Sequence, residues 1–135
     1  MRRLFLDSNV LFTAAHNPNG KAAFLFDLAD EGHWELRTSA YAAEEARRNI
    51  AAKFPKSLDR LDRLLSNLSV VPSGTGRSCP VDLPEKDRPI FEAAMKCGAT
   101  HLLTGDRKHF GFLMNRPDLT AGIVIRTVAG FLEKL

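Results

Sequence analysis

Two short apolar runs that each end in an aspartate constrain this chain more than any other feature. Residues 4–6 precede Asp7, and residues 99–103 precede the turn Thr104-Gly105-Asp106. Apolar runs of this length, bounded by turn residues, are typical of buried β-strands. Ligands of open α/β sheets bind at the carboxyl edge of the strands. Two strands of this kind therefore predict two carboxylates at one rim.

The remaining pattern is a regular alternation of strands and helices. We predict strands at 3–6, 34–38, 69–71, 99–103 and 123–125, and helices at about 8–15, 21–31, 39–50, 57–68, 87–97 and 108–114, with a last helix capped by Thr127. Such alternation predicts an α/β fold, a three-layer α/β/α sandwich with a central parallel sheet. With 135 residues and no linker or repeat, we expect a single domain spanning 1–135.

Composition excludes several classes of protein. Hydrophobic residues make up 44% of the chain and charged residues 26%, as in ordinary globular proteins. The net charge of +3 permits a nucleic-acid partner without requiring one. Cys79 and Cys97 have no CxxC spacing, so we expect reduced thiols. No apolar run approaches the roughly 20 residues of a membrane span, so we expect a cytoplasmic protein with no membrane contact.

Acidic residues recur where the predicted strands end or the predicted helices begin. Asp7 and Asp106 follow strands, while Asp87 and either Glu44 or Glu45 lie on helices that start at the same rim. A set of hard oxygen ligands with little His or Cys suits Mg²⁺ or Mn²⁺. These ions activate water and neutralise a developing oxyanion, which phosphodiester hydrolysis needs.

Some of these acids also have a simpler interpretation. Asp87 alone would be a helix N-cap, since Asp is a favoured cap, and both roles can hold together. Asp106 alone would be a turn residue. Asp7 has no evident structural role and is therefore the strongest candidate ligand. The choice between Glu44 and Glu45 stays open on these grounds.

Polar residues beside the acids suggest supporting roles. Ser8, Asn9 and Thr104 either orient the ligands or, for Ser8 and Asn9, only cap the next helix. We assign His109 no role. Basic residues adjoin the acids and are candidate contacts for phosphate groups: Arg47, Arg48, Arg107 and Lys108.

At these positions the chain resembles PIN domains, the fold of many ribonuclease toxins in bacterial toxin–antitoxin pairs (the VapC-like group). The matching elements occur in the order of the family. They are Leu6-Asp7-Ser8-Asn9, a helix in which an acid lies six positions after Ser39, Asp87 with Ile90 and Ala94, and Thr104-Gly105-Asp106 with Phe110. The ordered set is far more specific than any single motif.

The resemblance implies a metal-dependent endoribonuclease that is restrained by an antitoxin protein, and it also implies a homodimer. Because the family's acid lies six positions after the serine, the resemblance gives the central ligand role to Glu45, with Glu44 as the alternative. The implied catalytic and metal-binding set is Asp7, Glu45, Asp87 and Asp106, with Mg²⁺ or Mn²⁺ as cofactor and single-stranded RNA as substrate. Pro89, in the first turn after Asp87, departs from the family pattern.

Three other functions compete with this hypothesis. A phosphatase of the haloacid dehalogenase type would need a second Asp where this chain has Asn9. A non-catalytic RNA-binding or interaction module on a PIN scaffold would not need all four acids. A housekeeping RNA-processing nuclease would need no antitoxin. The Ser/Gly-rich segment 73–78 lacks the Gly-Lys-Ser/Thr ending of a phosphate loop, and we expect a surface loop there.

Overall fold

The computed structural model describes all 135 residues of the chain. Its strands are β1 (Arg3–Leu6), β2 (Glu35–Ser39), β3 (Ser69–Val71), β4 (His101–Leu103) and β5 (Val124–Arg126). The α-helices are α1 (Ser8–His16), α2 (Lys21–Asp30), α3 (Ala40–Lys53), α4 (Leu58–Ser66), α5 (Arg88–Lys96), α6 (Arg107–Phe110) and α7 (Val128–Glu133). Two 3₁₀ turns, η1 (Pro55–Ser57) and η2 (Gly111–Leu113), complete the regular structure.

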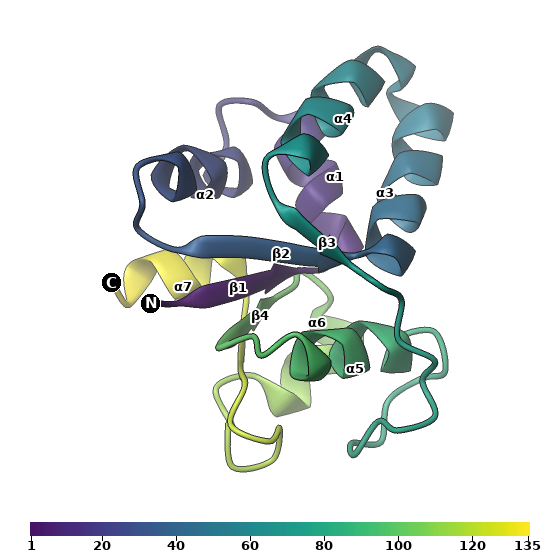
Figure 1. Cartoon of the computed structure of the whole chain (residues 1–135), viewed down its shortest axis with the longest axis vertical. Coiled ribbons are helices and arrows are strands. Elements are labelled where there is room, and N and C mark those ends of the chain that lie inside the picture. The colour runs from purple at the N-terminus through teal and green to yellow at the C-terminus, as the bar shows by residue number, and fades with distance from the viewer.

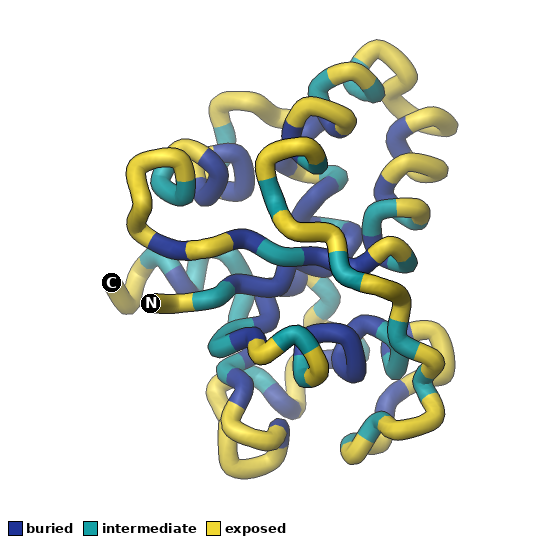
Figure 2. Tube along the Cα trace, in the orientation of Figure 1, coloured by how far each residue is buried: buried dark blue, intermediate teal, exposed yellow.

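The five strands form one parallel sheet in the order β3-β2-β1-β4-β5. Helices α1 to α4 cover one face, and α5 and α6 lie on the other (Figure 1). The predicted three-layer α/β/α sandwich is confirmed. The central strand β1 is apolar because both of its faces are covered, and Leu4, Phe5 and Leu6 have no exposed surface (Figure 2).

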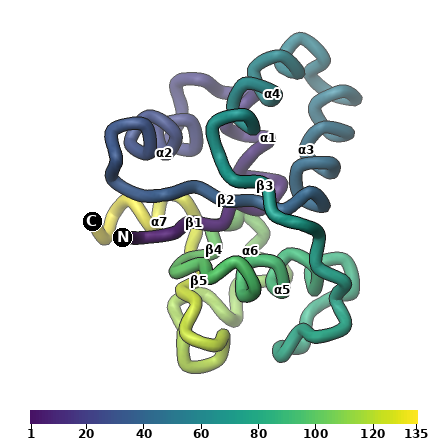
Figure 3. The backbone as a smooth tube through the Cα atoms, viewed as in Figure 1, coloured from purple at the N-terminus to yellow at the C-terminus, as the bar shows by residue number.

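The sheet changes its direction of growth at β1. The chain first adds β2 and β3 on one side of β1, then crosses the sheet and adds β4 and β5 on the other side (Figure 3). A crevice forms at such a switch point, outside the carboxyl ends of the two central strands. The Asp7 amide donates to the Leu103 carbonyl at 3.1 Å, so pairing of β1 with β4 continues to the first residue of the crevice.

Most predicted boundaries differ from the structure by one to three residues, and two differences have a clear local cause. Strand β4 begins at His101 rather than residue 99, because the preceding residues close α5. The Ala99 amide donates to the Ala94 carbonyl at 3.0 Å, and Gly98 has a φ of +73°. The helix predicted at 108–114 is a single α-turn followed by η2. It ends there because Met114 is extended and pairs with Ile125.

The loop at 72–80 is irregular, as predicted, and a buried side chain holds it. The Glu92 carboxylate, which has no exposed surface, accepts hydrogen bonds from the Thr75 amide (3.2 Å), the Ser78 amide (3.1 Å) and the Lys96 ammonium (2.8 Å). The Lys96 contact and the two amides hold the pKa of Glu92 at about 2, although burial opposes this. The backbone amides of Thr75 and Ser78 therefore already donate to the Glu92 carboxylate, so they are not free to bind a phosphate group.

Candidate metal centre

Asp7 lies at the switch point, directly after β1. One carboxylate oxygen of Asp7 accepts a hydrogen bond from the Ser8 backbone amide at 2.7 Å. The other oxygen accepts hydrogen bonds from the Thr104 hydroxyl at 2.8 Å and the Asn9 side-chain amide at 3.3 Å. Our expectation that Asp7 has no structural role was wrong, because its side chain caps α1. Burial raises the pKa of Asp7 to about 6, against these hydrogen bonds and with help from the charges of Glu45 and Asp87.

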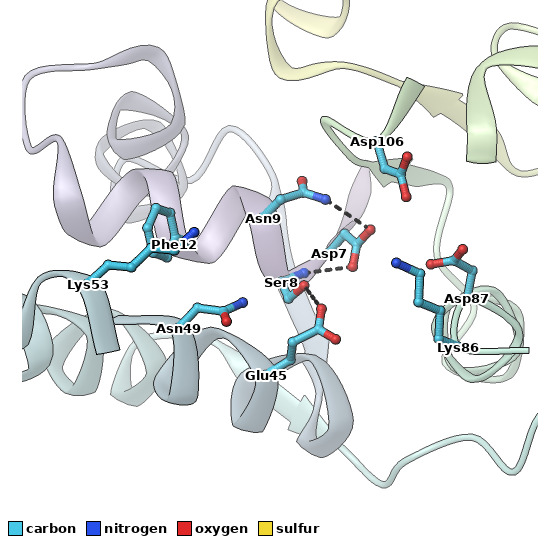
Figure 4. Close-up of a pocket in the computed structure, with 10 residues that line it drawn as sticks. All are labelled: Asp7, Ser8, Asn9, Phe12, Glu45, Asn49, Lys53, Lys86, Asp87 and Asp106. Atoms are coloured by element: carbon cyan, nitrogen blue, oxygen red, sulfur yellow. Dashed lines mark hydrogen bonds between the residues drawn. The ribbon is translucent and has the colours of Figure 1, made fainter. Parts of the chain in front are cut away.

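Glu45 faces Asp7 from helix α3. The hydroxyl of Ser39 accepts the Ala42 amide at 3.1 Å and caps α3, which fixes where the first turns of the helix point. Glu45 accepts a hydrogen bond from the Ser8 hydroxyl and lines the cavity in front of Asp7 (Figure 4). Glu44 is exposed and does not line this cavity. The structure therefore brings Glu45, and not its neighbour, to the other acids.

Asp87, Asp106 and His109 form a second group on the opposite side of Asp7. Asp106 caps α6 by accepting the His109 amide at 3.0 Å. The Nδ1 atom of His109 lies 2.8 Å from Oδ2 of Asp106 and 3.2 Å from Oδ2 of Asp87. One ligand atom from each of the three lies within 4.8 Å of the others, so this cluster could hold a metal ion. Sequence reasoning missed His109, although its place three residues after Asp106 puts both on one helical turn.

The Asp87 side chain is the clearest sign that a cation fits. Asp87 stands before α5, yet its side chain makes no capping hydrogen bond, so the N-cap interpretation does not account for it. Its Oδ2 atom is buried and accepts no hydrogen bond, although the Nδ1 atom of His109 lies 3.2 Å away. Burial raises the pKa of Asp87, and the His109 charge only partly opposes this. Such an orphaned buried oxygen is what a hard cation would satisfy.

Asp106 has the opposite electrostatic setting. Burial alone would raise its pKa, but the backbone amide and ring of His109 hold it below the usual value.

The Tyr41 hydroxyl, on α3, donates to the Lys86 carbonyl at 3.0 Å and so ties the segment before α5 to the helix that carries Glu45. Elements from both layers thus position the acids.

One cavity of about 300 Å³ joins these groups (Figure 4). Its lining combines the four predicted acids with polar and basic side chains and one aromatic ring: Asp7, Ser8, Asn9, Phe12, Glu45, Asn49, Lys53, Lys86, Asp87 and Asp106. Phe12, Asn49, Lys53 and Lys86 were not predicted. Asn49 and Lys53 could have been found, since they follow Glu45 at intervals of four on the same helix.

Ser8, Asn9 and Thr104 hold the acids and cap no helix. Asn9 accepts the Gly105 amide at 2.7 Å and donates to the Thr104 hydroxyl at 3.2 Å, which ties the turn after β4 to α1. The Thr104 hydroxyl also accepts the Asp106 amide at 3.1 Å. Of the two interpretations of Ser8 and Asn9, the geometry agrees with orientation of the candidate ligands.

The predicted phosphate contacts are less well placed. Arg47 forms an ion pair with Asp62 at 2.5 Å and does not line the cavity. Arg107 and Lys108 are exposed on α6 and also lie outside the lining. Lys53 and Lys86 are the cations that do line it.

Comparison with known proteins identifies the family. A family model described as PIN domain matches residues 3–108, so the chain belongs to the PIN-domain family. No curated protein matches the chain. No helix of the structure has both the length and the apolar character needed to cross a membrane.

Three solved structures resemble this chain at 12–15% identity, which shows a shared fold alone. VapBC2 from Rickettsia felis, bound to promoter DNA, has 14% identity and a TM-score of 0.66 over 93% of this chain and 98% of that chain. DNA-bound VapBC from Salmonella typhimurium has 15% identity and a TM-score of 0.66 over 95% and 99%. VapC20 from Mycobacterium tuberculosis, a sarcin-ricin loop cleaving toxin, has 12% identity and a TM-score of 0.55 over 78% and 92%.

Proposed function

We propose that this chain is a metal-dependent endoribonuclease that cleaves single-stranded RNA and acts as the toxin of a type II toxin–antitoxin pair. One observation carries the proposal: Asp7, Glu45, Asp87 and Asp106 line a single cavity at the switch point of a PIN-domain sheet. The rival non-catalytic module gives no reason for a buried oxygen of Asp87 that has no hydrogen-bond partner.

The four acids, with His109 beside them, would hold Mg²⁺ or Mn²⁺. When bound, such an ion supplies activation of water and neutralisation of the charge that develops on the phosphate. Its charge would also offset the repulsion between the carboxylates, which otherwise disfavours their ionised forms. We therefore assign ligand roles to Asp7, Glu45, Asp87 and Asp106.

The chain's own residues prepare the site for an RNA phosphate. The hydrogen bonds from Ser8 and Thr104 fix the Asp7 carboxylate, and the His109 ring fixes that of Asp106. The Lys86 side chain lies at the cavity beside Asp87 and is placed to contact a phosphate oxygen (Figure 4). An unpaired strand suits a cavity of this size, because its backbone is free to bend into the site.

The partner is inferred from the structural neighbours. Two of them are VapBC complexes bound to DNA, and a third is a toxin that cleaves the sarcin-ricin loop. We extend this to a cognate antitoxin that binds over the cavity and presents a basic side chain to its acids. A homodimer is a further part of the proposal, and gel filtration of the purified protein tests it.

The test of the proposed function combines a reaction and a growth assay. Purified wild-type protein should cleave single-stranded RNA with Mg²⁺ or Mn²⁺ and should lose that activity in excess EDTA. The Asp106→Asn variant should be inactive with either ion. Expressed alone, the wild type should arrest growth and Asp106→Asn should not. Cleavage without growth arrest would identify a housekeeping nuclease, and RNA binding without cleavage would identify a non-catalytic module. Equal cleavage in EDTA would contradict the metal-dependent mechanism.

A further inference from the structure

The cavity extends away from the acids along a groove between α1 and α3. Helix α3 presents Glu45, Asn49 and Lys53 at intervals of four residues, so they follow one another along one face. The eight residue steps from Glu45 to Lys53 span about 12 Å at the helical rise. Along this path the lining changes from carboxylate to amide to ammonium, and Figure 4 shows the three side chains in that order.

An aromatic cluster stands at the far end of the groove. Phe12 of α1 lies 5.8 Å from the Phe54 ring, measured between centroids, and His16 stacks on Phe54 at 3.7 Å with an interplanar angle of 17°. The Lys53 ammonium lies 5.8 Å from the Phe12 centroid. His16 and Phe54 are exposed, and Phe12 is partly so. Three aromatic rings and the Lys53 ammonium are therefore accessible to solvent beside the candidate site.

We propose that this aromatic cluster is a base-stacking subsite that holds an unpaired nucleotide of the RNA at the end of the groove away from the scissile phosphate. The inference rests on the proposed nuclease function. Lys53 contacts a backbone phosphate, Asn49 hydrogen-bonds the nucleotide between, and one base stacks on the rings of Phe12, His16 and Phe54. Strands stacked as in a duplex advance about 3.4 Å per nucleotide, so the groove corresponds to roughly three or four nucleotides.

The chemistry of the groove favours RNA over a protein segment. An amphipathic helix needs a predominantly apolar groove, whereas Phe12 is the only hydrophobic residue among the ten that line the cavity. The side chains that form the Lys53 end of the groove include no carboxylate: Phe12, His16, Asn49, Lys53 and Phe54. Aromatic faces next to a cation are the combination that binds single strands without regard to sequence.

The test compares two substrates that share the reacting bond. Bis(p-nitrophenyl) phosphate reaches only the acids, whereas a single-stranded RNA oligonucleotide also occupies the groove. The variants are Phe54→Leu and Lys53→Gln. Their controls are Phe24→Leu, which changes an exposed phenylalanine of α2, and Lys56→Gln, which changes an exposed lysine outside the cavity.

We expect the ratio of kcat/KM for RNA to kcat/KM for the small phosphodiester to fall about 5-fold or more in Phe54→Leu, as for loss of a stacked base. Lys53→Gln should also lower the ratio and reduce the salt dependence of RNA binding by about one phosphate contact. The two control variants should keep the wild-type ratio. An unchanged ratio in Phe54→Leu would overturn the inference, and so would a parallel loss on both substrates, which marks a structural role.

A binding measurement separates this inference from the proposed function. RNA carrying 2-aminopurine at successive positions should show quenched fluorescence at one position on binding wild type, and Phe54→Leu should restore that fluorescence. Quenching by a wild type that hydrolyses neither substrate would support the subsite and contradict the nuclease. Cleavage without any position-specific quenching would support the nuclease and overturn the subsite. Loss of binding to a protein partner in Phe54→Leu, with an unchanged ratio, would make the groove a protein interface instead.

Discussion

Two buried carboxylates in this protein have opposite electrostatic surroundings. Glu92, in the middle of α5, is fully buried and is paired with Lys96 and two backbone amides, and its pKa lies at about 2. Asp7, at the switch point, is almost as buried but has no cationic partner, and its pKa is raised to about 6. The charges of Glu45 and Asp87 raise that pKa further.

This difference in pKa distinguishes Glu92, which is paired within the fold, from Asp7, for which we propose a bound cation as partner. A buried charge is stabilised by a partner of opposite sign, and Glu92 has one within the chain. Asp7 receives neutral hydrogen bonds that fix its orientation without cancelling its charge. Strain of this kind is typical of functional sites. The missing partner of Asp7 is therefore assigned to the proposed Mg²⁺ or Mn²⁺.

The largest expected effect is on catalysis. Asp7→Asn should lower RNA cleavage by about 100-fold or more, since it removes a proposed metal ligand and alters the hydrogen bonds around it. Glu92→Gln keeps the shape of a buried side chain that does not line the cavity, and it should retain cleavage within a few-fold at a temperature where it is folded. Gel assays of RNA cleavage, with circular dichroism to verify folding, make the comparison. Equal losses of RNA cleavage in both variants would contradict the distinction between a ligand acid and a structural acid.

The next effect distinguishes neighbouring acids of α3. Glu45→Gln should remove most of the activity, whereas Glu44→Gln should cost little, because Glu44 is exposed and adjacent helix positions point about 100° apart. Initial rates on one RNA substrate measure both variants. A larger loss in Glu44→Gln would transfer the proposed ligand role to that residue.

The pH dependence of stability should have opposite signs for the two buried acids. Because the pKa of Asp7 rises from 3.8 to about 6 on folding, its stabilising contribution is present below pH 3.8 and lost as the pH rises through 6. That loss amounts to at most about 3 kcal/mol in EDTA. Because the pKa of Glu92 falls from 4.5 to about 2, its contribution is present above pH 4.5 and lost as the pH falls towards 2.

Thermal melts in EDTA at neutral pH test this pair of signs. Asp7→Asn should melt roughly 3 °C or more above wild type, since it removes the cost of a buried charge. Glu92→Gln should melt below wild type, because Lys96 and the loop amides lose their charged partner. An Asp7→Asn variant that melts lower than wild type at pH 7 would contradict the assigned sign.

The smallest expected effect concerns Asp87. Asn caps a helix about as well as Asp, and the Asp87 side chain makes no capping bond, so Asp87→Asn should retain the metal-free melting temperature or raise it slightly. Added Mg²⁺ should raise the wild-type midpoint by mass action and that of Asp87→Asn by less. Equal Mg²⁺ shifts would show that Asp87 is not a ligand.

The layers of the fold and the acids of the site could be predicted because their signals are local. The apolar runs before Asp7 and Asp106 define two central strands, and parallel strands bring their carboxyl ends to one rim. Glu45 was preferred to Glu44 only through the resemblance to PIN domains, in which the acid lies six positions after the serine. The strands and their carboxyl-terminal acids need only periodicity and chain direction.

The parts that were missed depend on contacts between distant segments. Lys86 reaches the cavity because the irregular chain after β3 carries it there, and no periodic pattern describes that path. The contact of His109 with Asp87 depends on how α6 packs beside α5. Arg47 was expected near phosphate, but its ion pair with Asp62 depends on the position of α4. Side-chain partners across elements are set by tertiary packing.

Binding of Mn²⁺, followed by electron paramagnetic resonance, tests most directly whether the two groups of acids form one metal site. Wild type should bind the ion, and Asp7→Asn and Asp106→Asn, one from each group, should each weaken binding by about 10-fold or more. Glu92→Gln should bind like wild type, because its carboxylate is already neutralised by Lys96. Wild-type affinity in Asp7→Asn or in Asp106→Asn would show that the groups do not share an ion and would contradict the account.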